Sequence, residues 1–513
     1  MAGGTLLSRV LGLIRDVLVA ALFPRYVSDA WTVAFRLPNL FRRLLGEGSL
    51  SVSFIPVFVR LLHKNDRNND DHKEAKDLVS SLFTLLSLIL TVLTFVFVVW
   101  MDPIMRLLVG GAGYASVAGK TEMTVRMAQI MFPFIFLMSI YAFFMAILNS
   151  FKKFAIGALA PCLLNLTLIA ATFIPAGNLP EQAYYQSWAV IVGGFLQMAL
   201  LVPQIIALGY FPKINFNFKS EPMRQIFKAF LPSMFGMSIV QITGVVNVYF
   251  ASQLPQGTHT YIYLADRVLE LPLSLFAVSL GSALLPTLSQ YWVRGEKEKM
   301  IATSAQNLRL IFFISVPCSA AFFFFSQPIV EVLFMRKEFN ADDVRATTDV
   351  LRVYSLTVLT ASAVRILAPC FYAISNTRLP AVSAAISLGI HVVIAPGLIQ
   401  KFGLVGLPWS TVISATFNMV TLFVAHQIYI GRLGLLNLFS GITRFAMSSS
   451  IMVFFLEYAK QFYFGQTTFV GKCIYLLGSI GIACGIYFVS SLALRVEETQ
   501  KLAAVVVRKI NRR

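Results

Sequence analysis

The sequence predicts an all-α polytopic membrane protein with about 14 transmembrane helices. Hydrophobic residues make up 57% of its 513 residues and charged residues 13%, with a mean hydropathy of +0.74. Soluble domains are clearly less apolar than this. Apolar runs long enough to cross a hydrocarbon core of roughly 30 Å recur along the whole chain. Their uninterrupted length predicts helices, because the strands of a membrane barrel alternate apolar and polar residues over roughly ten positions.

The apolar runs place the predicted spans as follows: 2–23, 27–59, 77–100, 122–149, 155–176, 184–208, 224–252, 260–290, 304–327, 347–373, 379–399, 404–429, 439–459 and 467–494. An even number of spans puts both termini on the same side of the membrane. Lys and Arg are concentrated in the loops and tail on that side, which the positive-inside rule assigns to the cytoplasm. The strongly polar segment 63–76 is then a solvated cytoplasmic loop.

A weak internal repeat suggests how the spans are grouped. RLPNLF and GSLSVSFIP in 36–56 are similar to ELPLSLF and GSALLP in 270–286. An even number of helices separates the two copies, so the halves share one orientation and are related by a pseudo-two-fold axis along the membrane normal. We therefore predict a six-helix bundle over 1–215, a second over 222–430, and two extra transmembrane helices with a basic cytoplasmic tail over 431–513.

The sequence contains no enzyme motif. The five cysteines lie in apolar stretches and the five histidines are scattered, so neither a metal site nor a catalytic nucleophile is expected. The net charge of +18 comes from short loops and the tail and not from a basic stripe with interleaved aromatics. Membrane topology accounts for it better than nucleic-acid binding does.

Charged side chains inside the predicted spans are the main candidates for function, because each is costly in hydrocarbon unless it faces protein or water. On ideal helices many of them fall on shared faces. The second span carries Asp29, Arg36, Asn39, Arg43 and Glu47 on one face, the first carries Arg9 and Asp16, and the eighth carries Asp266 and Glu270 with Arg267 beside them. Arg15 and Arg42 lie off these faces, although Pro38 can kink the second span.

Two interpretations of these charges remain open. They can pair with one another and hold helices together, since the carboxylates nearly balance the arginines. Alternatively they line a hydrated central cavity. Buried ion pairs contribute little net stability, which favours the cavity. The planar guanidinium fork binds phosphate in a bidentate manner, so an arginine-rich cavity favours a phosphate or diphosphate cargo.

Five segments resemble the MurJ (MviN) lipid II flippases of the multidrug/oligosaccharidyl-lipid/polysaccharide exporter superfamily. They are LLSRVLGLIRD (6–16), SDAWTVAFRLPNLFRRLLGEGSLSVSFIPVF (28–58), APCLLNL (160–166), YLADRVLELPLSLFAVSLGSALLPTLS (263–289) and LAPCFYA (367–373). The resemblance implies a multi-pass protein of the bacterial inner membrane. Such a protein moves lipid II, an undecaprenyl diphosphate that carries a disaccharide-pentapeptide, to the periplasmic leaflet by alternating access.

The resemblance also implies roles for individual residues. Substrate binding is expected from Arg9, Arg15, Arg42, Arg267, Asp29, Ser8, Asn39 and Arg36. Cavity or gate positions are expected at Asp16, Arg43, Glu47, Asp266, Glu270 and Arg365. The two extra helices are expected to form a groove for the polyprenyl tail, although simple lateral packing is the alternative. Membrane lipids, and proteins of cell-wall synthesis, are further candidate partners.

The resemblance implies no cofactor, and the energy source stays open. Some relatives are described as binding sodium through carboxylates on the seventh and eleventh helices. The corresponding stretches 231–250 and 381–398 contain no Asp or Glu, so a sodium site is doubtful. Coupling to the membrane potential, or to protonation of Asp29 or Glu47, is the expectation. The alternative functions are export of another polyprenyl-linked glycan, cation-coupled drug export on the same scaffold, and a non-transporting scaffold for cell-wall enzymes.

Overall fold

All regular secondary structure is helical in the part of the chain that the computed structural model describes, residues 2–45, 49–68, 72–153 and 155–510. The helices form two compact units, one of residues 1–260 with 336–339 and one of 261–335 with 340–513. The first unit contains α1 (Ala2–Leu22), α2 (Arg25–Leu45), α3 (Ser49–Asn68), α4 (Lys73–Val99), α5 (Met101–Leu108), α6 (Ala112–Ala115), α7 (Lys120–Met131), α8 (Phe134–Ser150), α9 (Ala155–Ala171), α10 (Leu179–Ala207) and α11 (Glu221–Ser252).

The second unit begins within α12 (Thr258–Pro272), which leads through a π-helical turn, η1 (Leu273–Ala277), into α13 (Val278–Val293). It continues with α14 (Lys297–Phe324), α15 (Ser326–Phe334), α16 (Ala341–Ser355), α17 (Thr357–Ala373), α18 (Arg378–Phe402), the 3-10 turn η2 (Gly403–Val405), α19 (Gly406–Tyr429), α20 (Leu435–Phe464), α21 (Phe469–Ala493) and α22 (Glu497–Ile510).

Eight described segments are long and apolar enough to cross a membrane: 73–99, 120–150, 179–207, 297–324, 341–373, 378–429, 435–464 and 469–493. One of them, 378–429, holds two predicted spans as α18 and α19. The other predicted spans correspond to α1, α2 with α3, α9, α11, and α12 with α13. The predicted fold class is confirmed, and the charges of α2 explain why this helix is not among the eight apolar segments.

An aromatic core holds the first unit together. α2 packs on α7 and α8, α3 packs on α8 and α11, and α9 packs on α1 and α10. Buried rings connect α2 and α3 to α8, with ring centroids 6.2 Å apart for Phe35 and Phe134 and 5.4 Å apart for Phe54 and Phe143. Aromatic contacts of this kind add specificity to the area that they bury. They fix α2, which carries most of the predicted site.

The contact-based division differs from the predicted boundary near residue 215. α11 packs on α2, α3 and α5 and therefore belongs to the first unit, so the division falls at Thr260. A sequence pattern that locates helices does not show which helices pack together, and α11 packs on helices that precede it in the chain. The predicted functional bundles, 1–215 and 222–430, remain a prediction.

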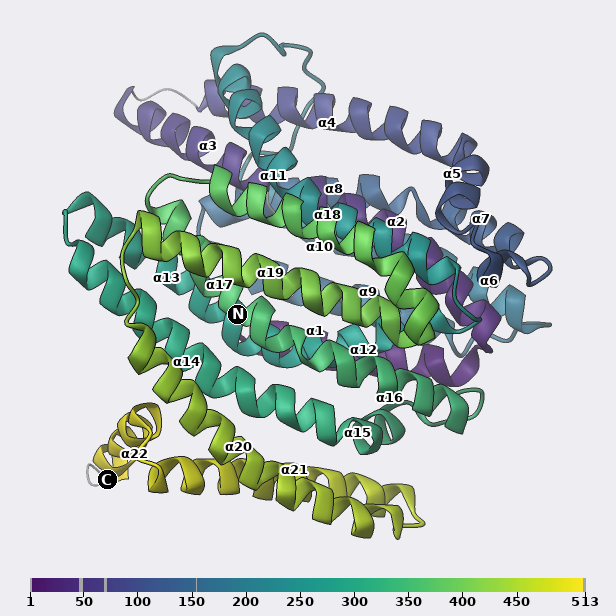
Figure 1. The fold of residues 1–513 in the computed structure, drawn as a ribbon. Coiled ribbons are helices and arrows are strands. Elements are labelled where there is room, and N and C mark those ends of the chain that lie inside the picture. Colours follow the sequence, from purple (N-terminus) through teal and green to yellow (C-terminus); the bar gives the residue numbers. More distant parts are fainter. Residues whose placement is uncertain (1, 46–48, 69–71, 154, 511–513) are drawn as a thin grey trace. The chain divides into compact units, whose positions relative to one another are not determined.

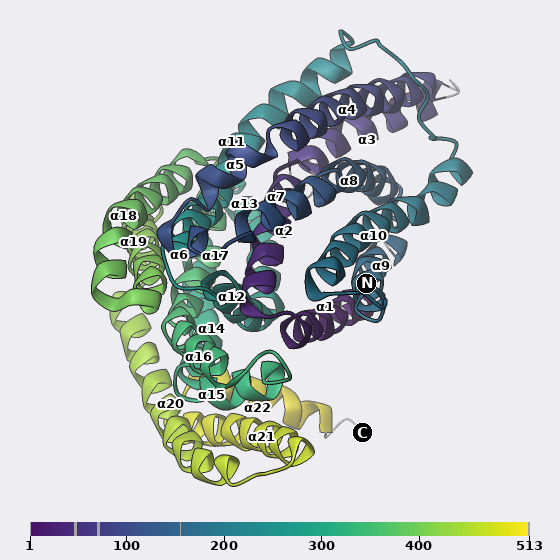
Figure 2. The same cartoon turned by 90° about the vertical axis from the view of Figure 1, so that its right-hand side faces the viewer.

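The C-terminal helices pack within the second unit. α20 lies along α14 and beside α21, as both views show (Figures 1 and 2). The Tyr487 hydroxyl donates to the Phe313 carbonyl at 2.8 Å, and the Arg309 guanidinium lies 2.9 Å from a Glu498 oxygen. These contacts anchor α21 and α22 to α14. The sequence predicts only a basic tail after residue 494, but in the structure this segment forms helix α22 up to Ile510.

Candidate functional site

The predicted site residues of α1 form a buried group with α9. Arg15 donates from Nε and a terminal nitrogen to Asp16 Oδ1, at 3.0 and 2.7 Å, and from its other terminal nitrogen to Asn165 Oδ1 at 3.1 Å. Asn165 Nδ2 in turn donates to the Ser8 carbonyl at 2.9 Å. Arg15 and Asp16 are both buried, while Arg9 and Ser8 are half-buried. Asn165 lies in the APCLLNL segment, but sequence reasoning did not single it out.

Along α2 the predicted polar stripe passes from buried to exposed. Asp29 is buried, Arg36 and Asn39 are half-buried, and Arg43 is exposed. Arg42 Nε donates to Asn39 Oδ1 at 2.8 Å. Arg36 lies beside α11, where its guanidinium is 3.6 Å from the position of a Cβ on Gly244. The charged residues of α2 therefore differ widely in solvent exposure, although they share one face of the helix. Glu47, the last member of the stripe, lies outside the described residues.

The predicted site residues of the second unit gather on α12. Arg267 donates to Glu270 Oε2 at 2.8 Å and to the Tyr263 hydroxyl at 3.0 Å, and its guanidinium lies 4.9 Å from the Tyr263 ring centroid. Asp266 is half-buried beside it. Arg365 on α17 is exposed and interacts electrostatically with Glu270. These groups form a polar cluster one turn before η1, and π-helical turns frequently occur at functional sites.

Asp29 lies at the centre of a different and fully buried cluster in the first unit. Its Oδ2 accepts from Lys120 Nζ at 2.9 Å and from the Gly257 amide at 2.7 Å. Its Oδ1 accepts from the amide and the hydroxyl of Thr260 at 3.0 and 2.9 Å. The side chains of Lys120 and Asp29 are 0% and 1% exposed. In this conformation Asp29 holds α2, α7 and the 253–260 turn together, and its predicted substrate contact stays a prediction.

Aromatic groups enclose the Lys120 ammonium. Lys120 Nζ lies 3.9 Å from the centroid of the Tyr114 ring, a cation-π contact that desolvation strengthens. The Tyr114 hydroxyl is 2.6 Å from Thr124 Oγ1. The rings of His259 and Tyr114 pack edge to face, with their centroids 5.3 Å apart. Burial, together with the nearby Asp29 charge, raises the pKa of Tyr114 well above its ordinary value. The phenol therefore stays protonated. Nothing in the sequence around Lys120 marks it as the partner of Asp29.

The same turn packs on α6 through two glycines. The Gly111 amide donates to Ser252 Oγ at 3.1 Å. A Cβ on Gly113 would lie 2.0 Å from the Leu254 carbonyl oxygen, a distance that real Cβ atoms do not reach. Backbone therefore touches backbone where the connections α5–α7 and α11–α12 meet. The Asp29 cluster lies at this meeting point of chain connections, at one end of the helices.

Substituting Gly113→Ala should destabilise this junction, because the added methyl meets main-chain atoms that cannot rotate away. Overpacking of this kind costs about 3 kcal/mol. Gly119→Ala is the matched comparison: its φ of +73° also disfavours a side chain, but no atom lies near. It should cost only about 1 kcal/mol. Melting temperatures of the two purified variants test the difference, and equal losses would contradict a steric contact at Gly113.

Comparison with known proteins places the chain among membrane transporters. A family model described as "Lipid II flippase MurJ" matches residues 18–503. A probable lipid II flippase MurJ of Bdellovibrio bacteriovorus is 40% identical over 502 residues, which cover 98% of this chain and 95% of the relative. The lipid II flippase MurJ of Burkholderia cenocepacia is 33% identical over 432 residues, which cover 83% of this chain and 82% of the relative.

Two solved structures share the fold. A lipid II flippase MurJ in an inward closed conformation matches with a TM-score of 0.79 at 23% identity, covering 96% of this chain and 98% of that one. An inward-facing multidrug resistance MATE transporter of the MOP superfamily matches with a TM-score of 0.70 at 14% identity, covering 82% of this chain and 94% of that one.

Proposed function

The chain belongs to the lipid II flippase MurJ family, and from this membership we propose that it moves lipid II from the cytoplasmic to the periplasmic leaflet of the inner membrane. The family match over 18–503 is the observation that carries the proposal. The charge pattern agrees with it, because arginines in α1, α2 and α12 suit a diphosphate better than a cationic drug. Both termini are proposed to lie in the cytoplasm.

In the proposed mechanism the diphosphate is held by arginines, with Arg15, Arg42 and Arg267 as the main contacts. In the described structure each guanidinium already donates to an oxygen acceptor: Arg15 to Asp16 and Asn165, Arg42 to Asn39, and Arg267 to Glu270. Phosphate oxygens can take the place of such acceptors, so these bonds keep the arginines oriented while no cargo is bound. Arg9, Arg36 and Arg43 add positive charge along the same helices.

The Asp29–Lys120 cluster is proposed to seal the membrane face at which α2, α7 and α12 begin. Opening that face would require these buried bonds to separate or to move as one body. The membrane potential is the proposed energy source: returning a net-positive, empty binding site toward the negative side is worth roughly 2.3 kcal/mol per charge per 100 mV. Protonation of Asp29 or Glu47 is the alternative coupling.

Depletion of the protein in its host tests the proposed cargo. We expect lipid II to accumulate and its headgroup to become inaccessible to a membrane-impermeant probe, because the precursor remains in the cytoplasmic leaflet. Expression of the intact chain should restore access. Unchanged access to lipid II, or accumulation of a different polyprenyl-linked glycan, would overturn the proposal.

A further inference from the structure

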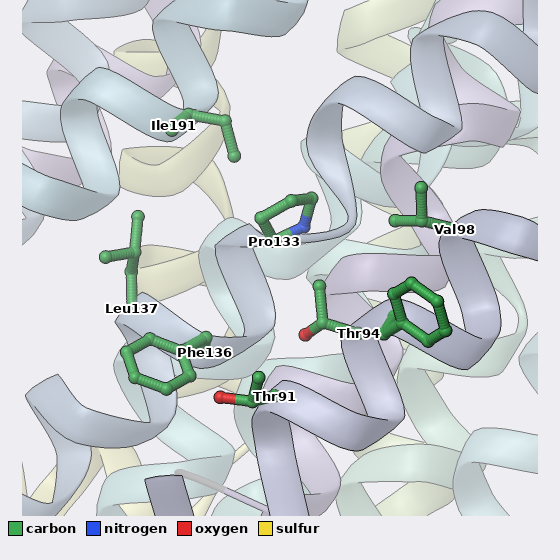
Figure 3. A pocket seen from close by; sticks show the side chains of 8 residues that line it. Thr91, Thr94, Val98, Pro133, Phe136, Leu137 and Ile191 are labelled. Atoms are coloured by element: carbon green, nitrogen blue, oxygen red, sulfur yellow. The ribbon is translucent and has the colours of Figure 1, made fainter. Parts of the chain in front are cut away.

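A groove of about 600 Å³ opens between three membrane helices of the first unit (Figure 3). It is lined by Thr91, Thr94, Phe95 and Val98 of α4, Pro133, Phe136 and Leu137 at the start of α8, and Ile191 of α10. In Figure 3 Pro133 lies between the α4 side chains and those of Leu137 and Ile191. The neighbouring Val92 and Val192 are about half exposed on candidate spans, so the groove faces the hydrocarbon of the membrane.

The groove exists because the 120–150 span is interrupted at Phe132 and Pro133. Proline has no amide hydrogen, so the helix loses a bond at this point. Beside this point Gln129 links α7 to α4 by donating from Nε2 to the Val98 carbonyl at 3.1 Å. The Thr91 hydroxyl donates to the Ser87 carbonyl at 2.7 Å, so it needs no water. The resulting wall is almost wholly apolar and suits a hydrocarbon chain.

A cation lies along the same groove, toward the start of α7 and α10. The Arg126 guanidinium is 5.1 Å from the ring centroid of Tyr184. Arg126 precedes Pro133 by seven residues and Tyr184 precedes Ile191 by seven, which is about two turns and 10 Å on each helix. Phe132 and Pro133 keep right-handed helical φ and ψ angles across the interruption, so the register is approximately maintained. The exposed fraction of Trp188, between Tyr184 and Ile191, is 56%, as expected at a membrane interface.

The nearby carboxylates are engaged with other groups. Glu122, one turn before Arg126, lies 3.4 Å from Arg106. Glu181 accepts from the Tyr185 hydroxyl at 2.8 Å and from the Gly177 amide at 2.9 Å. Among the described residues Arg126 forms no ion pair with a carboxylate, and it is exposed. Its charge is therefore available to an anion at the headgroup level.

We propose that Arg126 and the groove bind one anionic glycerophospholipid, with its phosphate on the guanidinium and one acyl chain along α4, α8 and α10. Arginine favours phosphate through bidentate, charge-assisted hydrogen bonds. An apolar groove that lies about 10 Å from the cation along the same helices fits an amphiphile and not a free phosphate ion. This lipid is resident and separate from the cargo, so the proposal does not rest on the flipping of lipid II.

Native mass spectrometry of the full-length protein in detergent tests the site with dioleoyl phosphatidylglycerol and dioleoyl phosphatidylcholine. We expect the first phosphatidylglycerol to bind more tightly than phosphatidylcholine. Arg126→Gln should weaken phosphatidylglycerol binding about tenfold and phosphatidylcholine binding much less, because the choline cation already compensates the phosphate of the zwitterionic lipid. Ile191→Trp, which fills the groove, should weaken both lipids.

Two variants serve as matched controls. Arg345→Gln removes an exposed cation of the second unit that is already paired with Asp342, and Val192→Trp adds the same bulk at the next position of α10. Both should bind lipid as the parent does, and melting temperatures verify that all four variants are folded. Equal affinities of the parent for both lipids, or equal effects of Arg126→Gln and Arg345→Gln, would overturn the headgroup contact. Equal effects of Ile191→Trp and Val192→Trp would overturn the acyl-chain groove.

Discussion

Replacing Lys120 with methionine should lower the stability of the protein by about 3–5 kcal/mol, the usual cost of leaving a buried charge without its partner. Methionine keeps the length of the side chain and much of its contact with Tyr114, so the lost ammonium is the main change. Asp29 would retain the Gly257 and Thr260 donors. Its negative charge, however, would be buried without a cation beside it. The melting temperature of the purified protein measures the effect.

A double-mutant cycle separates charge pairing from packing. Asp29→Asn with Lys120→Met removes both charges, and the single amide oxygen of asparagine can still accept from Thr260 at the Oδ1 position. The double variant should therefore be more stable than Lys120→Met alone. Arg106→Gln is the exposed control, and its loss should be under 1 kcal/mol. If the double variant is less stable than either single variant, the pair does not act through charge compensation.

Arg15→Ala, Arg42→Ala and Arg267→Ala should each abolish support of cell-wall growth while the protein still inserts into the membrane. The structure further predicts that they differ in stability. Arg15 is buried against Asp16, so its removal should also lower the melting temperature. Arg42 and Arg267 are only half-buried, and their variants should melt close to the parent.

Lysine substitutions refine this test, because lysine keeps the positive charge but lacks the planar fork. If bidentate phosphate binding matters, Arg42→Lys and Arg267→Lys should support growth only weakly. Arg60→Ala, which removes an exposed arginine whose bond is to Gln225, is the control and should grow normally. Growth of all three alanine variants would refute the arginine-held anion.

The helices and their charges could largely be predicted from the sequence, because apolar length and helical spacing are local properties. The positions at which the helices are interrupted could not be predicted in this way. The predicted span 122–149 is divided into α7 and α8, and 260–290 is α12, η1 and α13. Each contains a proline that an apolar pattern tolerates, and only packing decides where the helix changes.

The partners of the charges were harder to predict than the charges themselves. The shared face of Asp29, Arg36 and Asn39 predicts one common environment, yet burial decreases along α2 from Asp29 to Arg43. Lys120 follows a loop and has no helical spacing relative to Asp29, so only tertiary packing brings the two together. Asn165 illustrates the same point, since its bond to Arg15 spans 150 residues.

The π-helical turn η1 determines which insertions and deletions the surrounding helix can tolerate. A π turn contains one residue more than an α-helical turn would, so deletion of a single residue from Leu273–Ala277 could restore a continuous α-helix. Because the wider turn absorbs that residue, the deletion would leave the Arg267–Glu270 face nearly in phase with Gly281, whose missing side chain lets α13 approach the Arg365 carbonyl. Alleles in this segment should therefore tolerate a one-codon deletion more readily than a one-codon insertion, which would turn the same face by about 100°.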